Sequence, residues 1–98
     1  MELADLRPWY ERLQAELDAS RFAVGWVGPT DDRATRSARL SVDGPARLAE
    51  LIVWETGEAQ LQVGDVASGA VTDERLRLVD SGQVAQAVAR MKAWVTEN

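Results

Sequence analysis

The middle of this chain, from residue 37 to 79, is a series of strand-like segments separated by turns of a few residues. Residues 37–42 and 58–63 alternate polar with apolar side chains, which is the period of a strand that buries one face. Residues 48–54 form the most apolar stretch, and their β-branched and aromatic content favours a central strand. Residues 75–79 are expected to form the last strand. Because short turns join antiparallel strands, neighbours in sequence are expected to be neighbours in one sheet.

An amphipathic helix is predicted before these strands. Its apolar residues recur at steps of four, three and four, and so share one face: Leu6, Tyr10, Leu13 and Leu17. Asp5 is expected to cap the first turn, where Pro8 is tolerated because the N–H of that position has no helical partner. The helix is expected to end near Ser20, before a strand-like run at residues 22–27 and a loop at residues 28–32.

A second amphipathic helix is predicted after the strands, with Asp80 or Ser81 as its N-cap. Its apolar face consists of Val84, Val88, Met91 and Val95, flanked by Ala87 and Trp94. Two such helices cover one face of an antiparallel sheet, and the other face then meets solvent or a partner. The sequence therefore predicts one α+β domain over residues 1–98, an antiparallel sheet of four to five strands with an N-terminal and a C-terminal helix packed on one face.

The turn between residues 54 and 58 fixes the register of the two strands that it joins. A two-residue loop would need a positive φ at Thr56, which is costly for a β-branched residue. A three-residue loop asks only Gly57 to adopt the left-handed conformation, and this loop is therefore predicted. It fixes three cross-strand pairs: Trp54 with Glu58, Val53 with Ala59, and Leu51 with Leu61.

In this register two large apolar side chains, Ile52 and Trp54, lie outside the core. They share their face with carboxylates and amides: Glu50, Glu58, Gln60 and Gln62. The core face carries Leu51, Val53, Ala59, Leu61 and Val63. A large aromatic among polar groups is typical of an interface anchor, so we hypothesise that Trp54 contacts a partner. The alternative places Trp54 in the core or beneath a loop, whereas Trp9, Trp26 and Trp94 are expected in the core or at its edge.

Side chains for catalysis and metal binding are scarce. The chain has no cysteine and no histidine, which removes disulfides, thiolate ligands, the commonest metal ligand and the usual general base near neutral pH. We therefore expect no enzymatic activity, no cofactor and no metal. Asp31 and Asp32 lack the alternating oxygen ligands of a calcium-binding loop, and we interpret them as part of a solvated loop. Glu55 and Glu58 are interpreted as exposed turn residues rather than as an acid–base pair.

The net charge is −5, with 16 Asp and Glu against 11 Lys and Arg. The cations are spread among the carboxylates, so we expect no binding to nucleic acid, which requires clustered positive charge. An acidic surface instead speeds the encounter with a basic protein. Arg75 and Arg77 share a strand face and are interpreted as solvent-facing. No apolar run approaches roughly 18 residues and no basic-then-apolar segment opens the chain, so we expect no membrane span, no secretory signal and a cytoplasmic protein.

Residues 51–69 resemble bacterial immunity proteins of the TriTu type. Those small cytoplasmic proteins have an N-terminal helix, a strand region with a V-W-[ED]-[ST]-G-E-like turn, and a C-terminal helix that ends in a tryptophan. The matching residues of this chain are Val53, Trp54, Glu55, Thr56, Gly57 and Glu58, then Asp65 and Val66, and finally Ala93, Trp94 and Val95.

The resemblance implies an antidote that binds and blocks the toxin domain of a polymorphic toxin system. For the namesake, the toxin is an ADP-ribosyltransferase that attacks elongation factor Tu. Such enzymes hold an anionic dinucleotide in a cleft with basic groups, and the residues hypothesised to face that partner are Glu50, Ile52, Trp54, Glu55, Glu58 and Asp65. We expect a monomer or a weak homodimer. A competing interpretation is a structural or adaptor module that self-associates through its open sheet face or an edge strand. A small enzyme or ligand carrier would require a deep pocket.

Overall fold

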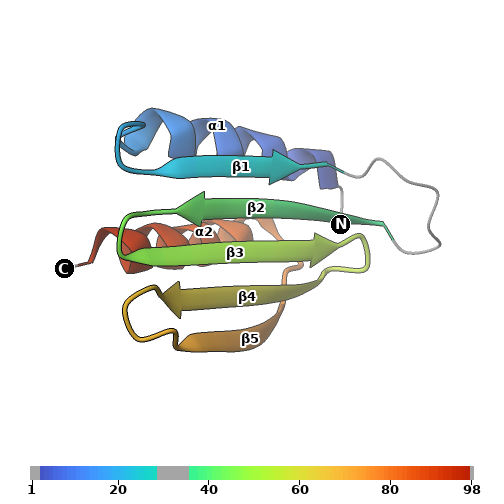
Figure 1. Cartoon of the computed structure of the whole chain (residues 1–98). Helices are drawn as coiled ribbons and strands as arrows, with labels where there is room; N and C mark the ends of the chain where they lie inside the picture. The colour runs from blue at the N-terminus through green and yellow to red at the C-terminus, as the bar shows by residue number, and fades with distance from the viewer. Residues whose placement is uncertain (1–2, 29–35, 98) are drawn as a thin grey trace.

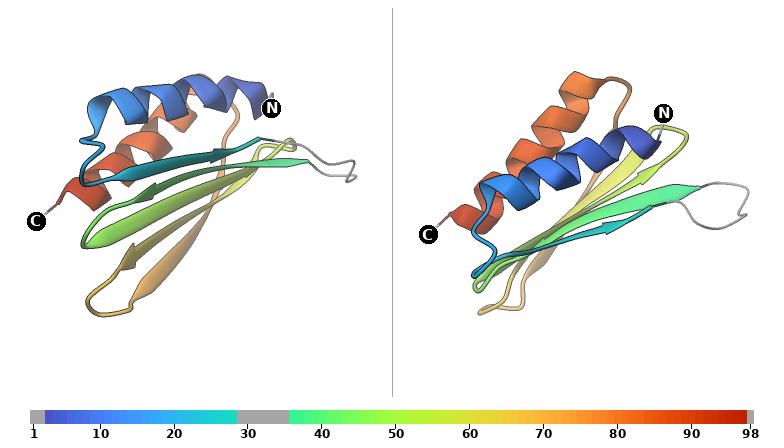
Figure 2. Two further views of the ribbon diagram at one scale, coloured as in Figure 1. Left: turned by 45° about the horizontal axis from the view of Figure 1, so that its top comes forward. Right: turned by 90° about the horizontal axis from the view of Figure 1, so that it is seen from above.

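A computed structural model of the chain describes residues 3–28 and 36–97, which form a five-stranded antiparallel sheet and two helices. The strands follow one another in the sheet in sequence order: β1 (Ala23–Val27), β2 (Ser37–Asp43), β3 (Arg47–Trp54), β4 (Glu58–Asp65) and β5 (Val71–Arg77). A short 3-10 helix, η1 (Leu3–Leu6), leads into α1 (Arg7–Glu16), and α2 (Ser81–Thr96) follows β5. Both helices lie on the same side of the sheet, α1 against β1 and α2 mainly against β3 (Figures 1 and 2). The predicted α+β fold is confirmed.

The hydrophobic core lies between the sheet and the two helices. Inward-facing residues of the strands alternate with outward-facing ones, as period-two patterning requires. The buried strand residues are Ala38, Leu40 and Val42 on β2, Ala49, Leu51 and Val53 on β3, and Ala59 and Leu61 on β4. The predicted apolar face of α2 is buried, and Leu6, Leu13 and Leu17 of the N-terminal segment are buried in the same core. Three tryptophans, Trp9, Trp26 and Trp94, are half-buried at the margin of this core, as expected.

The loop between β3 and β4 has the predicted length and register. Gly57 has a φ of +94°, and no residue other than glycine has a positive φ in the part of the chain that the structure describes. Val53 pairs with Ala59 and Leu51 with Leu61. The N–H of Gly57 donates to the carbonyl of Trp54 at 2.9 Å, which closes the turn. The face assignments that followed from this register are therefore confirmed.

The first helix differs from its prediction at both ends. Asp5 lies within η1, and the N-cap of α1 is Leu6, which makes no side-chain capping bond. Pro8 lies in the first turn of α1, as expected. The helix ends at Glu16 rather than near Ser20, because the carboxylate of Asp18 accepts hydrogen bonds from the N–H and hydroxyl of Ser20, at 2.9 and 2.7 Å. Such local bonds compete with helix continuation, and they lower the pKa of Asp18.

The last strand also differs from its prediction, since it spans Val71–Arg77 rather than residues 75–79. A tight turn closed by a 2.9 Å hydrogen bond from the N–H of Asp65 to the carbonyl of Ala70 starts the pairing of β5 with β4 early. Leu78 leaves the sheet and is buried in the core. Asp80 caps α2, because its carboxylate accepts from the N–H of Gln83 at 2.9 Å. Asp31 and Asp32 lie outside the described residues.

Candidate functional site

On one face of the sheet the described residues form no helix, and we call this face the open face. It is turned toward the viewer in Figure 1, with both helices behind the strands. Strand alternation and register place its central side chains in adjacent columns: Arg39, Ser41 and Asp43 on β2; Leu48, Glu50, Ile52 and Trp54 on β3; Glu58, Gln60 and Gln62 on β4; Asp73, Arg75 and Arg77 on β5. These columns form one extended surface across β2, β3, β4 and β5.

Ile52 and Trp54 lie on the open face, where the sequence placed them. Both are half-buried, and neither belongs to the buried core. Ile52 stands between Arg39 and Gln60 in the cross-strand register, and Trp54 stands opposite Ser37. The two apolar side chains are thus surrounded by polar neighbours at one end of the central strand. A surface of this kind matches the core and rim of a protein interface.

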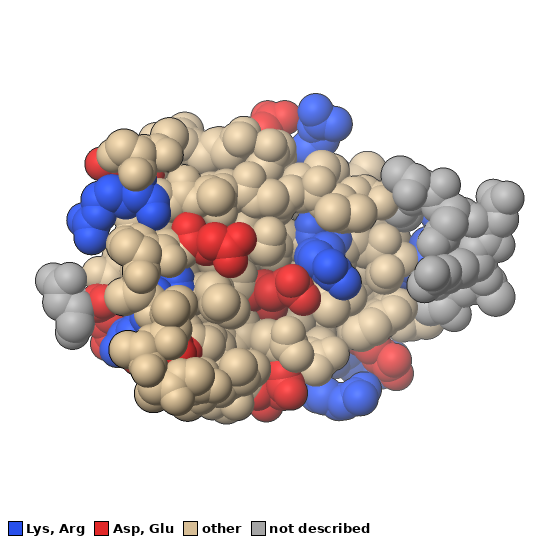
Figure 3. Space-filling view, viewed as in Figure 1, with Lys and Arg blue, Asp and Glu red and all other residues tan. Residues whose placement is uncertain are grey.

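Charges on the open face are mixed rather than uniformly acidic. Glu50 forms an ion pair with Arg39 at 3.6 Å, and Glu58 stands opposite Arg77 in the register. Figure 3 shows acidic and basic side chains scattered over this face, with uncharged surface between them. Glu55 lies in the turn at the end of β3, where its N–H donates to the carbonyl of Arg36 at 2.9 Å. The net negative charge of the chain is therefore not concentrated on the open face.

Asp65 is separated from the other proposed contact residues, because it lies on the helix side of the sheet. Its carboxylate accepts from the N–H of Ser68 at 3.1 Å and lies 3.9 Å from the guanidinium of Arg47. Arg47 stacks 4.3 Å from the ring centroid of Trp94 and pairs with Glu97 at 3.0 Å. The indole N–H of Trp94 donates to the carbonyl of Gly64 at 3.1 Å. These contacts hold the C-terminal end of α2 against β3 and β4. Asp65 takes part in them through its contact with Arg47.

Leu48 and Asp73 lie on the open face but were not assigned to it from the sequence. Leu48 is half-buried on β3, two residues before Glu50, and extending the period-two pattern backward would have found it. Asp73 was missed because the last strand was expected to begin at Arg75.

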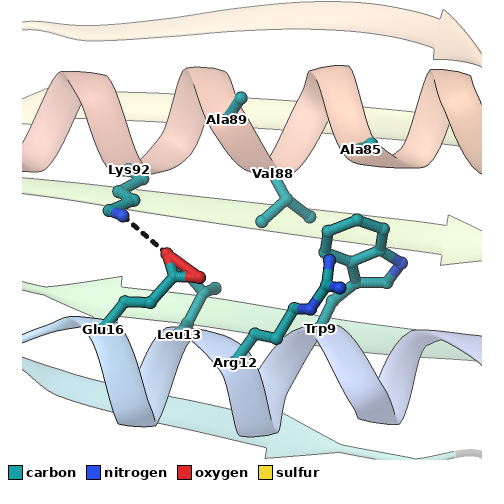
Figure 4. Close-up of a pocket in the computed structure, with 8 residues that line it drawn as sticks. All are labelled: Trp9, Arg12, Leu13, Glu16, Ala85, Val88, Ala89 and Lys92. Carbon is teal, nitrogen blue, oxygen red and sulfur yellow. Dashed lines mark hydrogen bonds and ion pairs between the residues drawn. The ribbon is translucent and has the colours of Figure 1, made fainter.

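The helix side carries a groove between α1 and α2, with a volume of about 210 Å³. Its lining is Trp9, Arg12, Leu13, Glu16, Ala85, Val88, Ala89 and Lys92 (Figure 4). Arg12 lies 4.8 Å from the ring centroid of Trp9, and Lys92 donates to Glu16 at 2.5 Å. The Lys92 ammonium holds the pKa of the Glu16 carboxyl below its ordinary value of 4.5. With its charged groups paired to neighbours, this groove is a weaker candidate than the open face.

A family model described as immunity protein TriTu matches residues 4–94 of the chain. The chain belongs to the TriTu family of immunity proteins. No match to a curated protein is found. The family match covers α1, all five strands and α2 up to Trp94, so the open face, Asp65 and Trp94 all lie within the matched residues.

Membership of an immunity-protein family implies binding to a toxin partner. In this TriTu chain, the described residues hold no group of three or more Asp and Glu side chains arranged to bind a metal ion. No helix within those same residues combines the length and apolar character that crossing a membrane requires. The open face offers apolar side chains, amides and paired charges, which suit non-covalent contact with another molecule.

Proposed function

We propose that this chain is the antidote of a toxin system, and that it blocks its cognate toxin domain by docking the open face of the sheet onto it. Ile52 and Trp54 are the apolar anchors, and Glu50 and Glu58 belong to the polar rim. Glu55 contributes from the adjoining turn. The protein acts in the cytoplasm without catalysis, cofactor or nucleic acid.

The observation that carries this proposal is the position of Trp54 in a TriTu-family chain. Trp54 stands half-buried on a helix-free face, next to Ile52 and among polar side chains. Tryptophan is the residue type most enriched among binding hot spots, and it contributes most where a polar rim excludes water around it. Trp54 is not part of the buried core, which lies on the opposite face of the sheet beneath the two helices.

The proposed target is a toxin of the ADP-ribosyltransferase class. Such an enzyme binds an anionic dinucleotide in a cleft with basic groups, which complements carboxylates at the edge of the open face. Glu55 and Glu58 lie at the turn beside Trp54. The indole ring of Trp54 and these two carboxylates would therefore enter the same cleft of the toxin. Asp65 stays outside this proposal, since it is held by Arg47 and Ser68 on the helix side.

Two matched tryptophan variants test the face. Trp54→Ala is expected to weaken binding to the cognate toxin by about 2 kcal/mol or more, which is roughly 30-fold. Trp9→Ala is the control, because Trp9 is also half-buried but lies in the groove between the helices. Titration calorimetry with the toxin domain measures both affinities. Equal losses in the two variants, or no loss in Trp54→Ala, would exclude the open face as the docking surface.

Charge reversals test the rim independently. The double variant Glu55→Lys, Glu58→Lys is expected to slow association and to reduce toxin neutralisation while the fold is retained. The double variant Asp5→Lys, Glu11→Lys changes the net charge equally at exposed positions on the helix side and is expected to protect fully. Circular dichroism monitors folding of both. Full protection by the first variant would rule out this edge of the open face.

A further inference from the structure

The outer edge of β5 is a second surface through which this chain can form hydrogen bonds with another chain. The sheet ends at this strand, which is hydrogen-bonded to β4 alone among the described strands. Every residue of β5 except Leu76 is exposed, and Val71 is 62% exposed. An edge strand with free N–H and C=O groups is a template for one more strand.

The phase of the β4–β5 ladder shows which backbone groups point outward. Hydrogen bonds join Asp65 to Ala70 at one end and Leu78 to Gly57 at the other, at 2.9 and 2.7 Å. Hydrogen-bonded pairs recur every second residue in an antiparallel ladder, and both ends give the same phase. The inward-bonding residues are therefore Thr72, Glu74 and Leu76. The residues whose backbone groups point outward are Val71, Asp73, Arg75 and Arg77.

These outward residues are self-complementary in charge. If two β5 strands run antiparallel about a two-fold axis at Glu74, Asp73 of each copy stands opposite Arg75 of the other. Opposite charges placed directly across a strand pair are stabilising, and like charges are destabilising. The two nearest registers that keep outward residues opposite one another are reached by shifting one strand by two residues. A shift in one direction places Asp73 opposite Asp73, and a shift in the other places Arg75 opposite Arg75. Of these three registers, the one with its axis at Glu74 is the only one that opposes no like charges among the outward residues.

We propose that β5 is a homodimerisation edge, which joins two copies of this chain into one continuous sheet in that register. The hydrogen-bonded pairs are Asp73 with Arg75 and Val71 with Arg77, each formed twice by symmetry. The aliphatic part of each Arg77 covers the exposed Val71 of the other copy. A one-residue slip would oppose outward groups to inward ones, and is excluded by the ladder phase.

The helix side of the joint contains the one like-charge pair of this register. Glu74 meets Glu74 of the second copy at the two-fold axis, but each Glu74 is already bound by Arg90 of its own chain. The second helix, α2, packs mainly against β3 and leaves room beside β5, where a groove of about 190 Å³ lies between the strand and the helix. Neither feature blocks the approach of a second sheet edge.

This pairing is independent of the proposed toxin contact. Trp54 and Ile52 are on β3, two strands from the joint, so each copy of the dimer keeps its own open face. Loss of self-association therefore leaves the antidote proposal standing, and loss of toxin binding leaves the dimer standing.

A charge swap tests the register directly. Sedimentation equilibrium of the full chain from micromolar to millimolar concentration is expected to show a reversible dimer. Asp73→Arg is expected to weaken it at least about tenfold, since two cross-strand pairs turn from attractive to repulsive together. The swap Asp73→Arg, Arg75→Asp is expected to restore the wild-type association. Asp43→Arg is the control, because Asp43 is equally an exposed carboxylate but lies on β2.

Amide hydrogen exchange supplies the second readout. The N–H groups of Val71, Asp73, Arg75 and Arg77 are expected to become slower as protein concentration rises. A monomer at every concentration would overturn the proposal, as would a dimer that Asp73→Arg leaves unchanged or that the swap fails to restore. Slowing of these amides only in the presence of the toxin would assign the edge to a strand of the toxin, and would equally overturn self-pairing.

Discussion

Gly57→Ala is the substitution that most sharply tests why the open face carries Trp54. Gly57 has a φ of +94°, a conformation that costs a residue with a side chain about 1–3 kcal/mol. A Cβ at this position would also lie 3.1 Å from the carbonyl oxygen of Leu78. That oxygen has little freedom to retreat, because the N–H of Leu78 donates to the carbonyl of Gly57 at 2.7 Å.

Gly69→Ala separates the cost of a positive φ from the cost of the contact with the carbonyl oxygen of Leu78. Gly69 also has a positive φ, of +73°, but a Cβ there meets no atom within 4 Å. We expect Gly69→Ala to lower the free energy of unfolding by about 1 kcal/mol and Gly57→Ala by about 2–3 kcal/mol. For a domain of this size the larger loss lowers Tm by about 10–20 °C.

Urea unfolding followed by circular dichroism measures both variants, and differential scanning calorimetry gives the two Tm values. Which variant loses more free energy of unfolding is a stronger test than the size of either loss. A Gly57→Ala variant as stable as the wild type would show that the turn does not need a glycine, and the register argument would fail. Equal losses in the two variants would show that the Leu78 contact has no energetic effect.

Three further outcomes are expected. Leu51→Ala, at a position with no exposed surface, lowers the free energy of unfolding by about 2–5 kcal/mol in urea, and Ile52→Ala on the open face lowers it by less. Stability measured against pH is flat from about pH 5 to 8, because the chain has no histidine. It falls as pH drops below about 4.5, because the pKa values of Glu16 and Glu74 are lowered in the fold by Lys92 and Arg90, so their contribution is lost on protonation. Lys92→Met returns the pKa of Glu16 toward 4.5 in an NMR titration.

The central hairpin was predictable from the sequence because several local signals agreed there. Alternation around Leu51 and Leu61 fixed which side chains face inward, and the need for a positive φ at Gly57 fixed the loop length. Both signals act within a few residues, so no knowledge of the rest of the fold was required. The same reasoning placed Ile52 and Trp54 on the open face.

Features that depend on distant contacts were not predictable in this way. Asp65 reads as a polar turn residue, and only the fold shows that Arg47 and Trp94 lie beside it on the helix side. The start of β5 at Val71 depends on pairing with Gly64 across a tight turn, not on the local pattern, in which Asp73 and Glu74 interrupt any alternation. The mixed charge of the open face likewise arises from strands that are far apart in sequence.

The most direct test of the docking account is the exposed fraction of Trp54 in a structure of this chain bound to its cognate toxin domain. The account predicts that Trp54 and Ile52 become buried against the toxin while Trp9 keeps the exposure that it has in the free chain. A toxin seated on α1 and α2, with Trp54 as exposed as before, would contradict it.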